Sequence, residues 1–187
     1  MQSEQSRLLT NAWLALKPHV KVGDFTLRSG RKSDLYVDVK SALLDCGGML
    51  IVIALERLRQ SVCCGPAIHY VGYGYGGAIL CSASAGIFVD RQATIFRGEQ
   101  KKHGLKSAPI GPVPDEDAVI IILEDVVTTE GSIRECLEQV KQCGWSAGKK
   151  IEMLTVVDRR LEADKSLPIS SLFNEHIIRV GMSADNK

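Results

Sequence analysis

Apolar residues follow a helical spacing in three parts of the chain. In residues 8–16 they recur every three or four positions and Pro18 ends the pattern, which predicts an amphipathic helix near the amino terminus. Residues 43–58 and 133–140 show the same spacing. Gly144 is placed to end the helix at 133–140. The pattern therefore predicts helices well separated along the chain.

Short apolar runs lie between these helices. Residues 119–123 are continuously apolar, as expected of a strand that is covered on both faces. Residues 151–157 predict another strand, and residues 68–71 predict a brief one that leads through a glycine-rich turn to a small helix at 78–85. Alternating strands and helices favour a mainly parallel sheet, with ligands at the carboxyl ends of its strands. We expect one α/β domain with a flavodoxin-like sheet.

Three segments lack a clear period. Residues 25–39 mix glycine, serine and basic residues with a short alternating run, which predicts a loop that feeds a strand. Residues 88–96 suggest two short extended pieces. Residues 97–117 carry a basic cluster and then three prolines, which predicts a mobile loop of roughly 20 residues, a length that is uncommon unless the loop is functional.

Composition narrows the class of protein. The 23 basic and 22 acidic residues give a formal charge of +1, so no global field favours nucleic acid or an anionic membrane. The amino terminus has no apolar core like that of a signal peptide, and no apolar run reaches the roughly 18 residues of a membrane helix. The six cysteines lack zinc-site spacing and the density of a disulfide scaffold. We expect a cytoplasmic protein with reduced thiols.

Residues 120–132 carry the clearest candidate chemistry. A buried strand is predicted to end in the acidic pair Glu124 and Asp125, before a turn with two threonines, a glycine and a serine that opens a helix. Such a turn suits a phosphate, and the carboxylates would face sugar hydroxyls or a magnesium ion, so the combination suggests a sugar phosphate. A capping box formed by Ser132 and Glu135 beside a solvated acidic pair explains the same residues about equally well.

Residues 121–132, Ile-Ile-Leu-Glu-Asp-Val-Val-Thr-Thr-Glu-Gly-Ser, resemble the phosphoribosyl diphosphate (PRPP) loop of type I phosphoribosyltransferases, and are closest to orotate phosphoribosyltransferase. Residues 25–33, Phe-Thr-Leu-Arg-Ser-Gly-Arg-Lys-Ser, with Tyr36 and Asp38, resemble the orotate-binding segment of that family. Residues 97–104, Arg-Gly-Glu-Gln-Lys-Lys-His-Gly, resemble its mobile catalytic loop. Asp158-Arg159 resembles a fourth element of the family, whose arginine contacts the orotate side.

The resemblance implies the type I phosphoribosyltransferase fold, a parallel flavodoxin-like sheet flanked by helices. It places a small amino-terminal hood at approximately 1–40, the core at 41–187 and the mobile loop at 97–117. It implies transfer of ribose 5-phosphate from PRPP to orotate, giving orotidine monophosphate and pyrophosphate in pyrimidine nucleotide biosynthesis. It also implies Mg²⁺ as cofactor and a homodimer whose loops are shared between active sites, with no nucleic acid or membrane as partner.

The resemblance assigns site residues by position. The catalytic residues would be Glu124, Asp125, Lys101 and His103. The residues that bind substrate would be Arg28, Tyr36, Arg97, Thr128, Thr129, Gly131, Ser132 and Arg159. Magnesium would be bound mainly through PRPP, near Glu124 and Asp125.

Four positions depart from the family pattern. Glu130 replaces a glycine of the PRPP loop, and a carboxylate beside a phosphate would repel it. Gly76 and Gly98 stand where the family has lysines that bind phosphates, and Arg28 replaces another lysine. The first three changes predict weakened PRPP binding. A catalytically impaired ligand sensor or partner-binding protein with this fold is therefore the alternative, and a transferase for another base is a further one.

Overall fold

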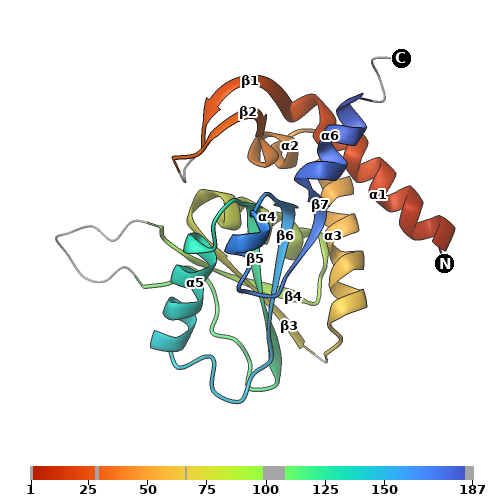
Figure 1. Ribbon diagram of the computed structural model, residues 1–187. Helices are drawn as coiled ribbons and strands as arrows, with labels where there is room; N and C mark the ends of the chain where they lie inside the picture. The colour runs from red at the N-terminus through yellow and green to blue at the C-terminus, as the bar shows by residue number, and fades with distance from the viewer. Residues whose placement is uncertain (1, 28–29, 66, 99–107, 184–187) are drawn as a thin grey trace.

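A parallel sheet forms the centre of the molecule (Figure 1). The computed structural model describes residues 2–27, 30–65, 67–98 and 108–183. The five strands lie in the order β4-β3-β5-β6-β7, and every neighbouring pair is parallel. Their bounds are β3 (Ala67–Tyr73), β4 (Arg91–Phe96), β5 (Ala118–Val127), β6 (Ile151–Asp158) and β7 (Ile169–Asn174).

Helices cover both faces of this sheet. The helices are α1 (Gln2–Leu16), α2 (Val39–Leu44), α3 (Gly48–Val62), α4 (Gly74–Ile87), α5 (Gly131–Gln142) and α6 (Glu175–Ser183), with short 3-10 turns at Lys17–His19 and Glu162–Asp164. From β5, Ile121 and Leu123 pack into the core that holds α3 and α4, whereas Ile120 and Ile122 pack with α5. The predicted strand covered on both faces is confirmed.

An antiparallel hairpin of β1 (Val20–Thr26) and β2 (Lys32–Val37) lies beyond the edge of the sheet at which β5 and β6 end (Figure 1). We call the hairpin and the short helix α2 the hood; the hood predicted at approximately 1–40 also included α1, which packs against α3. No helix in the described part of the chain is long and apolar enough to cross a bilayer.

Several predicted boundaries were wrong. Residues 43–58 are not one helix, because α2 ends at Leu44 and α3 begins at Gly48. A Cβ at Gly48 would lie 2.3 Å from the Leu43 carbonyl oxygen, so the chain turns there too tightly for any other residue. Residues 88–96 contain the single strand β4 rather than two extended pieces, and a strand was missed at Val20–Thr26.

The acidic pair lies within β5 rather than after it. Pairing with β6 continues to Val127, which is in register with Asp158, so the sheet holds the backbone of Glu124 and Asp125 on that side. The predicted capping box is also wrong. Helix α5 begins at Gly131 with Glu130 at its N-cap position, and no side chain caps it.

Glu130 instead anchors the β5–α5 turn to the segment that follows β6. One carboxylate oxygen accepts hydrogen bonds from the backbone N–H groups of Ser166 and Leu167, at 2.7 Å each, and from Arg160 at 2.8 Å. The other oxygen accepts from the Ser166 hydroxyl and from Arg134, the latter at 2.6 Å. The side chain is only 4% exposed.

This environment fixes the charge of Glu130. Burial alone would raise the pKa of the carboxyl group, but the hydrogen bonds from Ser166, Leu167 and Arg134 outweigh burial and lower the pKa to about 2. The side chain therefore remains ionised and tied to its partners over the physiological pH range.

We expect Glu130→Gly to lower the free energy of unfolding by about 3 kcal/mol, because it leaves the buried Arg160 without one of its carboxylates. Urea denaturation measures the loss. Glu138→Gly, in an exposed interior position of α5, is the control and should cost about 1 kcal/mol, the usual helix penalty of glycine. Equal losses for the two variants would contradict a structural role for Glu130.

The Glu130→Gln variant tests how the contribution of the Glu130 charge to the free energy of unfolding depends on pH. Because folding lowers the pKa of Glu130 from 4.5 to about 2, the stability that its charge contributes is present above pH 4.5 and is lost as the pH falls toward 2. The difference in unfolding free energy between wild type and variant should therefore be constant at neutral pH and shrink below pH 4.5. A constant difference down to pH 3 would show that the charge contributes nothing.

Candidate functional site

A cavity of about 500 Å³ opens at the carboxyl edge of the sheet. Its walls come from the hairpin and α2, from the turn between β3 and α4, and from the end of β5 with the start of α5. Ligands of open parallel sheets bind at such an edge, where turns point backbone groups and side chains toward one space. This cavity is therefore the candidate site.

The cavity gathers residues that lie far apart in the sequence. Eight of the predicted site residues line it: Tyr36, Glu124, Asp125, Thr128, Thr129, Gly131, Ser132 and Arg159. Arg97 is exposed just after β4 and is not part of the lining. Three further predicted residues, Arg28, Lys101 and His103, lie outside the described residues, as do residues 99–107 of the predicted mobile loop.

The acidic pair forms the floor of the cavity near the hood. Glu124 and Asp125 are each only 7% exposed. Asp125 Oδ2 lies 3.1 Å from Nζ of Lys40, and Glu124 Oε1 accepts the backbone N–H of Asp125 at 3.2 Å. The two carboxylates are held in a fixed geometry, which suits the recognition of sugar hydroxyls or a cation.

The turn before α5 supplies hydrogen-bond donors. The first intrahelical bond runs from the Arg134 N–H to the Glu130 carbonyl, so the N–H groups of residues 131–133 precede the helical ladder. Thr128 and Ser132, which carry hydroxyl groups, line the same wall. The donors and the positive end of the helix dipole make this wall suitable for a phosphate.

Glu130 does not contribute to this wall. It is absent from the residues that line the cavity, and its carboxylate is bonded to Ser166, Leu167 and Arg160. The sequence analysis placed this carboxylate beside the phosphate, and that expectation was wrong. The carboxylate is buried away from the phosphate-binding wall, because the segment after β6 supplies its partners.

Close packing accounts for the glycines at the two positions of the family's lysines. A Cβ at Gly76 would lie 2.1 Å from Asp125 Oδ1, so a side chain there would displace that carboxylate. A Cβ at Gly98 would lie 3.2 Å from the Cα of Gly74, whose φ of +64° itself favours glycine. Residue 76 therefore favours glycine in this chain, whereas a side chain at residue 98 would need Gly74 to shift by a few tenths of an ångström.

Arg159 fastens the hood to the core at the other side of the cavity. Its guanidinium donates to the Ser33 hydroxyl at 2.8 Å, the Leu35 carbonyl at 3.0 Å and the Glu175 carboxylate at 3.0 Å. The side chain is 1% exposed. Three of the five N–H donors of a guanidinium are thus committed to protein groups.

Lys40 is a site residue that the sequence analysis missed. It lies in the first turn of α2, lines the cavity and pairs with Asp125. The available signal was the lone charged residue of the stretch 39–44, two positions after Asp38. Asp38 itself caps α2 by accepting hydrogen bonds from the backbone and hydroxyl of Ser41.

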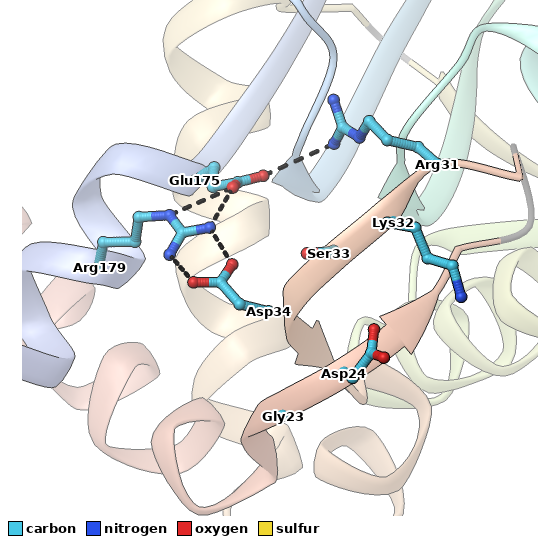
Figure 2. Close-up of a pocket in the computed structure, with 8 residues that line it drawn as sticks. All are labelled: Gly23, Asp24, Arg31, Lys32, Ser33, Asp34, Glu175 and Arg179. Carbon is cyan, nitrogen blue, oxygen red and sulfur yellow. Dashed lines mark hydrogen bonds and ion pairs between the residues drawn. The ribbon is translucent and has the colours of Figure 1, made fainter.

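A second hollow, of about 560 Å³, lies between the hairpin and α6. Figure 2 shows that its charged side chains are largely paired with one another. Arg179 bonds to Asp34 and Glu175, and Arg31 lies 3.7 Å from Glu175. These contacts hold α6 against the hairpin, so we regard this hollow as structural.

The acidic pair fits a magnesium ion that is shared with a substrate. In the described residues no group of three or more histidine, cysteine, aspartate or glutamate side chains is arranged to hold a metal. Magnesium, however, is commonly bound by one or two carboxylates together with substrate phosphates and water. Glu124 and Asp125 are the carboxylates on the cavity floor that could contribute.

Similar proteins point to a family for this chain. An orotate phosphoribosyltransferase of Methanospirillum hungatei is 38% identical over 149 residues, which cover 79% of this chain and 80% of that protein. The orotate phosphoribosyltransferase of Thermosynechococcus vestitus is 34% identical over 82% of both chains. No protein-family model matches the chain.

Solved structures share the fold. Orotate phosphoribosyltransferase from Aeropyrum pernix aligns with a TM-score of 0.71 at 21% identity, covering 94% of this chain and 99% of that one. The Mycobacterium tuberculosis enzyme, solved with inorganic phosphate, aligns with a TM-score of 0.67 at 24% identity, covering 92% and 98%. The predicted fold is confirmed, and with relatives this similar over most of its length the chain belongs to the orotate phosphoribosyltransferase family.

Proposed function

We propose that this protein transfers ribose 5-phosphate from PRPP to orotate, giving orotidine monophosphate and pyrophosphate in pyrimidine nucleotide biosynthesis. The observation that carries the proposal is the cavity at the end of β5, where the acidic pair adjoins the phosphate-binding wall at the start of α5. A sugar phosphate needs both features side by side. Family membership supports the assignment of the donor and of the acceptor base.

The 5′-phosphate of PRPP would bind at the turn before α5. Backbone N–H groups of Gly131 and Ser132 and the hydroxyls of Thr128, Thr129 and Ser132 would donate to its oxygens. The Glu130 carboxylate is bonded elsewhere, so it does not oppose this binding. The family's glycine is thus replaced here without a charge in the wall.

The ribose would lie over Glu124 and Asp125. Their carboxylates accept hydrogen bonds from the ribose hydroxyls and favour the positive charge that develops on the ring as the bond to pyrophosphate breaks. Pyrophosphate leaves with the electron pair of that C–O bond, while a ring nitrogen of orotate forms the new bond to the same carbon and loses its proton. Because the two carboxylates are held rigidly, they need little rearrangement during the reaction.

Orotate would bind between the hood and Arg159. Tyr36 lines this side of the cavity, and the two guanidinium donors beyond the three committed ones suit a carboxylate or carbonyl of the base. Arg28 is assigned to the same subsite by its place in the family motif. The hood thus supplies the acceptor subsite and the core the donor subsite.

Magnesium and the loop complete the proposal. Bound through PRPP near Glu124 and Asp125, magnesium would neutralise charge on the leaving pyrophosphate. Arg97, Lys101 and His103 would bring cations to the same oxygens when the loop closes. By resemblance to the family, we propose a cytoplasmic homodimer in which each loop serves the partner's site.

Calorimetric titration with PRPP and Mg²⁺, followed by an assay of orotate absorbance, tests this function. We expect saturable PRPP binding and loss of orotate absorbance that depends on PRPP. No binding at millimolar PRPP would contradict the proposal. Binding without turnover would favour the ligand-sensor alternative, which Gly76 and Gly98 motivate. Turnover of a different base would overturn the choice of orotate as acceptor.

The Asp125→Asn variant tests the acidic pair. Loss of a negative charge beside the ribose should lower kcat about 100-fold, by analogy with the removal of one electrostatic group from an active site. Steady-state assays measure the change. Asp164→Asn, on an exposed turn outside the cavity, is the control and should retain full activity. Equal activity of the two variants would remove Asp125 from the mechanism.

A further inference from the structure

We propose that Lys40 binds the diphosphate group of the sugar donor and of the pyrophosphate product. This inference deepens the proposed function and rests on it. It assigns a substrate-binding role to a residue of the hood that the sequence motifs do not include. Four observations support it: the exposure of Lys40, the commitments of Arg159, the contact between Gly76 and Asp125, and the balance of charge in the cavity.

The ammonium group of Lys40 is placed between a buried carboxylate and the cavity. Its Nζ lies 3.1 Å from Asp125 Oδ2. The Lys40 side chain is 40% exposed, whereas that of Asp125 is 10% exposed. An ammonium group has three N–H donors, and the pair with Asp125 uses one of them. The side of the group that faces away from Asp125 is therefore available to an anion.

Lys40 is the basic side chain best placed to meet that anion within the described residues. Among the described residues that line the cavity, the other basic one is Arg159. Arg159 is 1% exposed and donates to Ser33, Leu35 and Glu175, which hold it on the hood side. A polyanion that enters the described cavity thus meets the charge of Lys40 first.

Gly76 explains why the cation comes from the hood. The carboxylate of Asp125 occupies the space above Gly76, with both oxygens within 2.8 Å of the position a Cβ would take. No longer side chain can extend from residue 76 unless Asp125 moves. Lys40 reaches the same carboxylate from α2, so it supplies a positive charge beside the place where the family has a lysine.

The pair between Lys40 and Asp125 reduces the negative charge that a diphosphate would meet in the cavity. Glu124 and Asp125 place two carboxylates on the cavity floor, and both would repel a diphosphate. The ammonium group of Lys40, 3.1 Å from Asp125 Oδ2, offsets one of these carboxylates where the diphosphate would approach.

A purely structural role would have different consequences. If Lys40 only fastened α2 to β5, its replacement would lower thermal stability and leave the affinity for pyrophosphate unchanged once the protein is folded. If it binds the diphosphate, loss of its charge weakens pyrophosphate and PRPP selectively. The affinity for orotate should be much less affected, because orotate is assigned to the side of Tyr36 and Arg159.

Isothermal titration of the full chain with inorganic pyrophosphate and Mg²⁺, with steady-state kinetics, separates the two roles. We expect Lys40→Met to weaken pyrophosphate binding and to raise KM for PRPP at least tenfold, with KM for orotate within twofold of wild type. Lys40→Gln removes the charge but keeps an amide that can still bond to Asp125. It should weaken pyrophosphate binding and raise KM for PRPP as much as Lys40→Met does. Lys40→Arg should restore pyrophosphate affinity to within about threefold.

Lys21→Met, on the exposed part of β1, is the matched control and should bind pyrophosphate like wild type. Unchanged pyrophosphate affinity in folded Lys40→Met or Lys40→Gln would overturn the role of Lys40 while leaving the proposed function intact. If wild type itself binds neither PRPP nor pyrophosphate, the proposed function fails and this inference fails with it. The wild-type and variant titrations therefore distinguish the two failures.

Discussion

Burial of β5 on both faces is the constraint on which the rest of the structure depends. The strand lies at the middle of the sheet between β3 and β6, and its apolar side chains enter two cores in alternation. Polar side chains of β5 therefore lie at its carboxyl end, beyond the apolar run that fills the two cores. Glu124 and Asp125 come directly after the apolar run, and pairing to Val127 holds their backbone in the sheet. The rigidity of the acidic pair thus follows from burial of the strand before it.

Two carboxylates of this segment, Asp125 and Glu130, are then compensated in different ways. Glu130 turns away from the cavity and is neutralised by Arg160 and by hydrogen bonds from Ser166 and Leu167. Asp125 stays in the cavity and is paired with Lys40 from the hood. The outcome is a cavity whose negative charge is limited to the places where the ribose would need it.

The sequence predicted the parts that depend on local pattern. The apolar run of β5 and the helix that follows were predicted from periodicity. Eight cavity residues were assigned by the resemblance of three separate segments to the family motifs. The orientation of Glu130 was not predictable, since its partners Ser166 and Leu167 lie 36 and 37 residues further along the chain. The pair between Lys40 and Asp125 spans 85 residues. Such contacts arise only once the segments are brought together.

A crystal structure of the protein with ribose 5-phosphate and Mg²⁺ would test the central claim most directly. We predict the phosphate within hydrogen-bond distance of the backbone N–H groups of Gly131 and Ser132, with the ribose hydroxyls on Glu124 and Asp125. The Glu130 carboxylate should still be bonded to residues 166 and 167. A phosphate bound elsewhere, or a Glu130 side chain that must leave its partners to admit the phosphate, would contradict the account.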